Sequence, residues 1–257
     1  MKVFFISDLH FDHNPGLLNV FVDFLKKHKP EVLVVGGDLF NGSSRLGGLL
    51  KILKEHTSRL LFVPGNHDLW HSDTLGAVDT TEMYRKYIRG TVLRSGCDYL
   101  PSGGVIINGI GFAGTTGWYD AFPASGQKTP DEKLCFFPGL ASPSDVVEKM
   151  AEDLERQLYD LETHVDRIAV TVHTVPFPAK IADSIEENIL GYQGSDVLGN
   201  VIMKHDKVKH VFSGHLHRQF RARIGDKVWQ SVAYGYAREL SVSPEEHLLQ
   251  CTAMIDF

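Results

Sequence analysis

The chain has 257 residues, of which 43% are hydrophobic and 23% are charged. This is an ordinary globular composition, and it excludes collagen-like, low-complexity and disordered proteins. The 26 basic and 32 acidic residues give a formal net charge of −6 without a long block of either sign. Such a mildly acidic chain is not expected to bind duplex nucleic acid.

The cysteine content and the apolar runs indicate a cytoplasmic protein. The 3 cysteines are far apart in the sequence, as is typical of reduced thiols. The apolar run at residues 2–6 is too short for a signal peptide, and no later run approaches the roughly 18 apolar residues of a membrane span. We therefore expect no membrane association, and the oligomeric state stays open.

Apolar runs alternate with helical patterns in the first part of the chain. Three runs predict buried strands: residues 2–6, 32–35 and 60–63. Apolar residues at helical spacing predict helices after these strands: residues 14–28, 44–56 and a segment that starts at the capping pair Asp79 and Glu82. This alternation is typical of a layered α/β domain.

The second part of the chain begins with a predicted hairpin over residues 105–113, because Asn108-Gly109 suits a type I′ turn. The remaining predicted elements are a long helix from Ser142-Pro143, a strand at 168–172, a helix at 196–203, a strand at 208–212 and two or three antiparallel strands from Val228 onward. No linker is long enough to separate domains, so we expect a single domain over residues 1–257.

Five predicted strands are each followed by residues that can bind metal ions. These segments are Asp8-Leu9-His10, Gly37-Asp38, Gly65-Asn66-His67-Asp68, His173 and Gly214-His215-Leu216-His217. In layered α/β folds the carboxyl ends of the strands share one edge, so we expect these side chains to meet in one crevice. The glycines beside Asp38, Asn66 and His215 would allow sharp turns there.

These side chains outnumber the ligands of one metal ion. A tetrahedral zinc site takes four ligands, whereas this set fits two ions about 3.5–4 Å apart that share a carboxylate. Imidazole and carboxylate ligands suit Mn, Fe, Zn, Co and Ni. The expected cofactors are two divalent or mixed-valence transition-metal ions, with Mn as the first choice.

The ordered set Asp-x-His, Gly-Asp, Gly-Asn-His-Asp, His and Gly-His-x-His resembles that of the calcineurin-like metallophosphoesterase superfamily. All five blocks occur in order between residues 8 and 217. The resemblance implies an α/β fold, a four-layer α/β/β/α sandwich of two mixed sheets flanked by helices. It also implies hydrolysis of a small phosphate-ester substrate.

The same resemblance implies a role for each ligand. The roles are Asp8, His10 and His217 for the first ion, Asn66, His173 and His215 for the second, and Asp38 as the bridge between them. We expect the two ions to share a hydroxide that attacks phosphorus. His67 would protonate the leaving oxygen as a general acid, and Asp68 would hold its imidazole in the working orientation.

Two regions are candidates for substrate contacts. Residues 114–143 are rich in Gly and Pro and predict a long loop on the substrate side, where Trp118, Tyr119 and Phe122 could line the substrate or anchor the loop. Arg238 could reach a phosphate or be a surface arginine. Both alternatives stay open at each place.

Departures from related sequences narrow the expected reaction. Ser/Thr protein phosphatases have Gly-Asp-x-Val-Asp-Arg-Gly, whereas here Gly37-Asp38 is followed by Leu39-Phe40-Asn41-Gly42. Purple acid phosphatases have a tyrosine at the position of Asn41. The resemblance therefore favours bacterial phosphodiesterases. A phosphomonoesterase for a small metabolite and a non-catalytic metal-binding scaffold are the alternatives.

Overall fold

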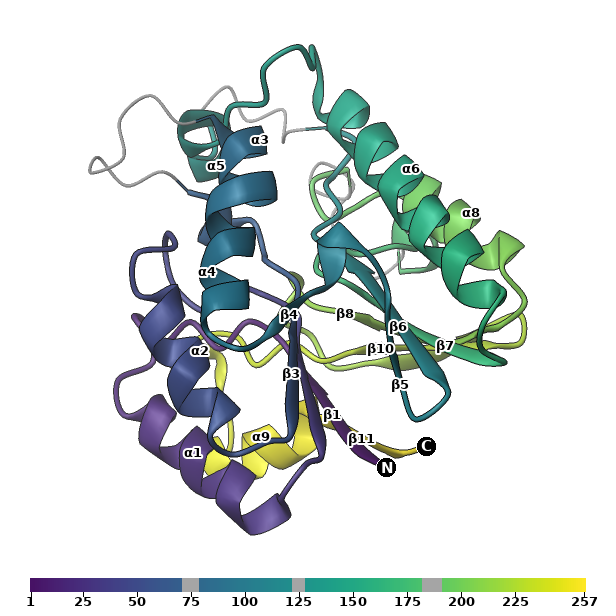
Figure 1. Cartoon of the computed structure of the whole chain (residues 1–257). Helices are drawn as coiled ribbons and strands as arrows, with labels where there is room; N and C mark the ends of the chain where they lie inside the picture. Colours follow the sequence, from purple (N-terminus) through teal and green to yellow (C-terminus); the bar gives the residue numbers. More distant parts are fainter. Residues whose placement is uncertain (71–78, 122–127, 182–190) are drawn as a thin grey trace.

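The apolar runs form strands that are buried on both faces, because two sheets pack against each other and helices cover the outer side of each (Figure 1). This arrangement confirms the expected four-layer sandwich. The computed structural model describes residues 1–70, 79–121, 128–181 and 191–257. Residues 122–127 of the expected substrate-side loop, and Phe122 with them, lie outside the described residues.

The first sheet has five strands in the order β11-β1-β2-β3-β4. Four of them are parallel, and β11 pairs with β1 in the antiparallel direction. The strands are β1 (Lys2–Ile6), β2 (Val32–Val35), β3 (Arg59–Phe62), β4 (Asp98–Tyr99) and β11 (Ala253–Asp256). The carboxyl ends of β1, β2 and β3 consequently lie at one edge.

The second sheet has six strands in the order β5-β6-β7-β8-β10-β9. The four central strands are parallel, and the two outer strands pair with them in the antiparallel direction. The strands are β5 (Val105–Ile107), β6 (Ile110–Thr115), β7 (Arg167–Val172), β8 (Val208–Ser213), β9 (Arg221–Ile224) and β10 (Lys227–Ser231).

Helices form the two outer layers. They are α1 (Leu17–His28), α2 (Leu46–Lys54), α3 (Thr80–Glu82), α4 (Arg89–Arg94), α5 (Pro130–Leu134), α6 (Pro143–Glu162), α8 (Asp196–Lys204) and α9 (Pro244–Cys251). A π-helical segment, Met83–Ile88, connects α3 to α4. In Figure 1, α1, α2 and α9 lie on the side of the first sheet and α6 and α8 on the side of the second.

Alternate residues of the central strands fill the space between the sheets. In β1, Val3 and Phe5 belong to this inner core, whereas Phe4 and Ile6 belong to the core under the helices. The ring of Phe5 stacks on Phe212 of β8 with centroids 3.7 Å apart. This contact holds together two strands from different sheets whose ends carry predicted ligands.

Local sequence signals explain most of the element boundaries. Asp79 accepts a hydrogen bond from the backbone N–H of Glu82 at 2.7 Å, as its capping position predicts. Asn108 and Gly109 have φ angles of 49° and 77°, which a type I′ turn requires. The predicted hairpin and the helix start at Asp79 are therefore confirmed.

The prediction for the C-terminal tail is wrong in part. Strand β10 does pair with β9 in the antiparallel direction, but it is parallel to β8. Residues 244–251 form helix α9, and β11 then joins the first sheet. Ser243 caps α9 by accepting a hydrogen bond from Glu246 N–H at 3.3 Å, with Pro244 in the first turn. The helix-start signal of Ser243 and Pro244 therefore outweighs the pattern that predicted a strand in this part of the tail.

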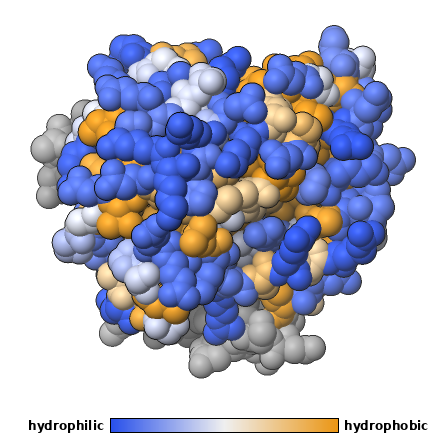
Figure 2. All heavy atoms as spheres, turned by 90° about the horizontal axis from the view of Figure 1, so that it is seen from below, coloured by the Kyte–Doolittle hydropathy of each residue, from blue (hydrophilic) through white to orange (hydrophobic). Residues whose placement is uncertain are grey.

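The described helices include none that is long and apolar enough to cross a membrane. The face seen from below in Figure 2 is mainly hydrophilic, with hydrophobic residues in separate patches. Large exposed apolar side chains of the described chain come from different elements, among them Phe136, Tyr159 and Leu249. Single apolar residues of this kind are normal on a globular surface.

We expect Phe5→Ala to lower the free energy of unfolding by about 3–5 kcal/mol, because it leaves a cavity beside Phe212 in the inner core. Chemical denaturation followed by circular dichroism measures this change. Phe136 is 67% exposed, so Phe136→Ala is the matched control and should change the stability by less than about 0.5 kcal/mol. Equal losses in the two variants would contradict this account of the inner core.

Candidate metal centre

The predicted ligands lie at the edge where five parallel strands end. They follow β1, β2, β3, β7 and β8 as Asp8 with His10, Asp38, Asn66, His173, and His215 with His217. The two sheets are joined at this edge, because Ser7 after β1 pairs with Ala233 after β10 and His173 after β7 bonds to the Gly36 carbonyl after β2 at 2.7 Å. Loops from both sheets therefore converge on one place.

The backbone turns sharply at these ligands. Among the described residues, seven non-glycine residues have a positive φ, and five of them are predicted ligands: Asp8 (57°), His10 (38°), Asp38 (55°), His215 (66°) and His217 (52°). Side-chain-bearing residues rarely adopt this conformation, which costs about 1–3 kcal/mol each. Strain of this kind is concentrated at functional sites.

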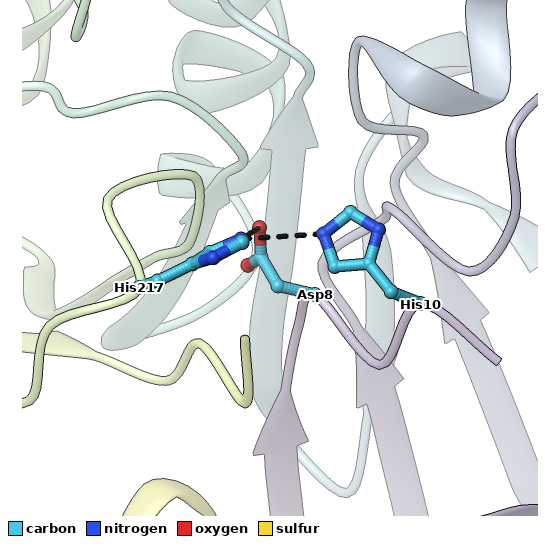
Figure 3. A group of neighbouring side chains, drawn as sticks. All are labelled: Asp8, His10 and His217. Carbon is cyan, nitrogen blue, oxygen red and sulfur yellow. Dashed lines mark hydrogen bonds and ion pairs between the residues drawn. The ribbon is translucent and has the colours of Figure 1, made fainter. Parts of the chain in front are cut away.

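The first cluster consists of Asp8, His10 and His217, whose ligand atoms all lie within 4.8 Å of one another (Figure 3). The Nε2 atoms of His10 and His217 are 3.2 Å apart. His217 Nε2 is 3.3 Å from Asp8 Oδ1. Two ring nitrogens and a carboxylate oxygen therefore face the same position, and these are the residues predicted for the first ion.

The second cluster centres on the side-chain oxygen of Asn66. This Oδ1 lies 3.0 Å from His173 Nε2 and 3.2 Å from His215 Nδ1. Asp38 Oδ2 is 3.4 Å from His173 Nε2 and 3.8 Å from His10 Nε2. Asp38 thus lies between the two clusters, in the place that a bridging carboxylate would take.

Hydrogen bonds outside the clusters fix the orientation of three of the four imidazole rings. These bonds are His173 Nδ1 to the Gly36 carbonyl at 2.7 Å, His215 Nε2 to the Tyr192 carbonyl at 3.3 Å and His217 Nδ1 to Glu239 Oε2 at 3.1 Å. A neutral imidazole carries one N–H, so each of these bonds leaves a lone pair on the nitrogen that faces the cluster. This is the usual arrangement behind a metal-binding histidine.

The carboxylates of the site stay ionised although they are buried. Burial raises the pKa of Asp8, but the hydrogen bond from His217 and the charge of His173 outweigh it and lower the pKa to about 2. Burial also opposes ionisation of Asp38, and the charges of His173 and His67 outweigh it, so its pKa is well below the usual range. Two buried negative charges therefore face the space between the clusters.

The net pKa shifts of the buried imidazoles differ in direction. Burial lowers the pKa of both His10 and His215 to about 4, so both rings are neutral at pH 7 and can act as ligands. For His173, burial lowers the pKa, but the charge of Asp38 outweighs this and raises it to about 10. A cation that binds beside His173 must therefore displace a proton.

The donor set fits two transition-metal ions. It combines two carboxylates, one amide oxygen and four imidazole nitrogens in two clusters that share Asp38. A single tetrahedral ion has room for only four of these ligands. The same donors suit Mn, Fe, Zn, Co and Ni, so the chemistry of the ligands does not select one metal.

Three glycines beside the predicted ligands have no side chain, and the ligand atoms and the neighbouring backbone occupy the space that a Cβ atom would need. A Cβ atom on Gly65 would lie 2.0 Å from Asp38 Oδ1, and one on Gly214 would lie 2.2 Å from Asp8 Oδ2. Gly37 has a φ of +93°, and its Cβ would lie 2.1 Å from the Gly65 nitrogen. A side chain at any of these three positions would collide with a ligand or with the neighbouring backbone, and the sharp turn expected beside Asp38 is present at Gly37.

His67 lies at the mouth of the site, with 16% of its side chain exposed. Its Nδ1 donates to Asn41 Oδ1 at 2.7 Å, and its Nε2 is 3.9 Å from Asp38 Oδ2. Its ring stacks on Trp70 with centroids 3.8 Å apart. The amide of Asn41 in turn bonds to His13 Nε2 at 3.0 Å. His67 is therefore held in one orientation with Nε2 toward the ligands.

The orienting role expected for Asp68 is wrong, because this carboxylate is fully committed to the backbone. It accepts hydrogen bonds from the N–H groups of Asp38 at 2.8 Å, Gly65 at 2.9 Å and Leu39 at 3.2 Å. Burial and the charge of Asp38 raise the pKa of Asp68 to about 7. Asp68 fixes the turns that carry Asp38 and Asn66, and Asn41 takes the place beside His67.

The expected substrate-side residues lie at different depths. Trp118 is 1% exposed and Tyr119 is 0% exposed, and their rings stack with centroids 4.7 Å apart, which is the packing that the anchoring alternative requires. Arg238 is exposed, with its guanidinium 4.8 Å from the centroid of the Tyr236 ring. That ring stacks on His10 at 4.6 Å. Arg238 is therefore connected to His10 of the first cluster through the Tyr236 ring.

Several residues that contact the predicted set are missing from it, and three of them bond directly to His67 or to a predicted ligand through their side chains. Asn41 bonds to His67, Glu239 bonds to His217 and Asp131 bonds to Asn66. Of these three, only Asn41 lies close to a motif block, three positions after Asp38. The other two become partners of the ligands through the fold alone.

Comparison with known proteins gives a family and several structural neighbours. Residues 1–219 match the family model described as Calcineurin-like phosphoesterase. No curated protein sequence matches the chain. Phosphopantetheinyl hydrolase from Mycobacterium tuberculosis has a TM-score of 0.75 and 17% identity, with 93% of this chain and 90% of that protein covered.

Two further solved structures share the fold. TT1561 of Thermus thermophilus has a TM-score of 0.59 and 15% identity, with 99% of this chain and 98% of the other covered. A dimetal phosphatase from Danio rerio has a TM-score of 0.57 and 12% identity, with 90% and 86% covered. At these identities the likeness shows a common fold.

We expect His10→Ala and His215→Ala to lose different metal ions, because each removes a ligand from only one cluster. Calorimetric titration of metal-stripped protein with Mn²⁺ should show one strong site left in each variant, with the other weakened by more than about 100-fold. The exposed His164→Ala is the control and should keep both sites. Full loss of both ions in either single variant would contradict two separate clusters.

We also expect Gly65→Ala to lower the Mn²⁺ content, since the added methyl group collides with Asp38. Plasma mass spectrometry of dialysed protein measures the bound metal. A Cβ atom on Gly48 in α2 would meet no other atom within 4 Å, so Gly48→Ala is the matched control. It should keep the metal and stabilise α2 by up to about 1 kcal/mol. Normal metal content in Gly65→Ala would show that the turn tolerates a side chain.

Proposed function

Because this chain belongs to the calcineurin-like phosphoesterase family, a family of metal-dependent phosphoesterases, we propose that it is a phosphodiesterase in which His67 is the general acid. The observation that carries the proposal is the placement of His67 between the ligands and solvent. The ring is held through Nδ1 by Asn41, and Nε2 is directed toward Asp38. Hydrolysis of an ester with an alkoxide leaving group needs such a proton donor.

The chain itself positions the reacting groups. When bound, two divalent ions supply an ionised water and offset the charge of the phosphoryl oxygens. The backbone N–H of His67 donates to Asp38 Oδ1 at 2.9 Å, so the acid and the bridging carboxylate have a fixed spacing. Trp70 covers one face of the His67 ring and limits its movement. With Nδ1–H bonded to Asn41, only the imidazolium form of His67 also carries a proton on Nε2, and in that form the proton is available to a leaving oxygen on the open side.

The charge around the site favours a diester over a monoester. Besides Asp8 and Asp38, the carboxylates of Asp131 and Glu239 each bond to a predicted ligand. Negative surroundings repel a doubly charged monoester more strongly than a singly charged diester. The ions neutralise the inner carboxylates, and the outer ones keep the field unfavourable for a dianion.

We expect metal-stripped protein to gain hydrolysis of bis-p-nitrophenyl phosphate when Mn²⁺ is added, and to cleave p-nitrophenyl phosphate more slowly. Absorbance at neutral pH measures both rates. A phosphopantetheinyl ester is a useful third substrate, because the mycobacterial neighbour is a phosphopantetheinyl hydrolase.

A clear preference for the monoester would favour a phosphatase for a small metabolite and overturn the diester proposal. If folded, metal-loaded protein cleaved none of the three esters, the non-catalytic scaffold would gain support.

We expect His67→Ala to lower kcat for a diester with an alkyl leaving group by about 10²–10⁴-fold, because that leaving group needs a proton. The loss should be much smaller for a nitrophenyl leaving group, and Mn²⁺ binding should be retained. Asn41→Leu should show the same leaving-group dependence to a smaller degree. His164→Ala serves as the control. Wild-type rates with the alkyl ester in His67→Ala would remove His67 from this role.

A further inference from the structure

A buried carboxylate behind the second cluster connects three segments of the site. Asp131 is 0% exposed and accepts hydrogen bonds from Asn66 Nδ2 at 3.1 Å, from Trp70 Nε1 at 2.6 Å and from the hydroxyl of Tyr192. Such charge-assisted bonds compensate for the cost of burying the carboxylate. A capping box between Thr129 and Glu132 fixes the start of α5, which carries Asp131.

The amide of Asn66 can face the cluster with either its oxygen or its nitrogen. Only the oxygen has lone pairs for a metal ion, whereas the NH₂ group is a donor. The two ends have nearly the same shape, so their hydrogen-bond partners decide the orientation. Asp131 accepts from Asn66 Nδ2 with both of its oxygens, at 3.1 and 3.2 Å. An ionised carboxylate only accepts, so it selects the orientation that places Oδ1 among His173 and His215.

Trp70 and Tyr192, which also donate to Asp131, each touch a different group of the site. The Trp70 ring stacks on His67 with centroids 3.8 Å apart. The Tyr192 carbonyl accepts from His215 Nε2 at 3.3 Å. Asp131 therefore contacts one predicted ligand, Asn66, directly. It also contacts the proposed acid His67 through Trp70, and a second predicted ligand, His215, through Tyr192.

We propose that Asp131 is a positioning residue that keeps the side-chain oxygen of Asn66 turned toward the second metal ion. The proposal rests on the ligand role of Asn66 that accompanies the proposed function. It requires neither the diester preference nor the acid role of His67. Its test is consequently a metal-binding measurement on the unreacted protein.

We expect Asp131→Asn to weaken one of the two Mn²⁺ sites by about 10–100-fold, the range for loss of a partner that orients a ligand, and to leave the other within about twofold. Calorimetric titration of the stripped protein measures both sites, and the thermal unfolding of metal-free protein checks the fold. Asp153 is a partly buried carboxylate that pairs with Arg85 and Arg156, so Asp153→Asn is the matched control. It should bind both ions as the wild type does.

A second variant separates orientation from general support. Asn66→Asp places a symmetric carboxylate at the ligand position, where either orientation offers an oxygen. In the Asn66→Asp background, adding Asp131→Asn should therefore cause no further loss of Mn²⁺ affinity. This comparison remains decisive if Asp131→Asn alone is poorly folded.

Two results would overturn the inference. One is wild-type affinity at both sites in Asp131→Asn. The other is an equal loss of affinity from Asp131→Asn in the wild-type and Asn66→Asp backgrounds, as a merely structural residue would give. A wild-type protein that binds two ions but cleaves no ester would contradict the proposed function. The role of Asp131 would still be decided by the same metal titrations.

Discussion

Two carboxylates, Asp8 and Asp38, are buried side by side at the junction of the two sheets, and their charge determines much of the surrounding structure. Unpaired buried charges are costly, so the fold must provide compensating groups. The backbone N–H of His215 donates to both oxygens of Asp8 at 3.0 and 3.1 Å, and that of His67 donates to Asp38. Imidazole protons or metal ions supply the remaining positive charge.

This requirement explains the strained backbone around the ligands. A carboxylate of the first sheet and an N–H of the second can meet only if the chain turns back directly after each strand. The left-handed φ angles at Asp8, Asp38 and His215 make these turns. Backbone bonds hold them, such as Asp8 N–H to the Gly37 carbonyl at 2.9 Å and His10 N–H to the Asp38 carbonyl at 2.9 Å. The strain is thus compensated by contacts between neighbouring loops.

The parts of the site that sequence could predict are those encoded within a few residues. Asp8 and His10, or His215 and His217, stand directly after apolar runs, so residue type and strand position together identify them as candidate ligands. The pairing of Asp131 with Asn66 spans 65 residues, and no local pattern indicates it. Asp68 shows the opposite failure, because it is expected to orient the His67 ring and its carboxylate instead bonds to backbone N–H groups. The sequence of strands and polar residues along the chain predicts which residues gather at an edge. The tertiary fold determines which of their side chains are in contact.

The same distinction applies to the fold. Strand β2 and the hairpin of β5 and β6 are specified by apolar runs and turn residues, and both are as predicted. The C-terminal strand β11 pairs with β1 from the opposite end of the chain, with Lys2 opposite Asp256. No sequence period specifies such a partner. The stacked rings of Trp118 and Tyr119 likewise show that aromatic residues close to a site can be buried in the core that supports it.

The two clusters differ in the groups that surround their ligands. Behind the second cluster lie the Gly36 and Tyr192 carbonyls and Asp131, and His173 is 0% exposed. Around the first cluster, His217 is 16% exposed and its partner Glu239 is 40% exposed. His67 lies on this open side too. His67 is itself 16% exposed, so a leaving oxygen that departs toward solvent on this side would pass the proposed proton donor.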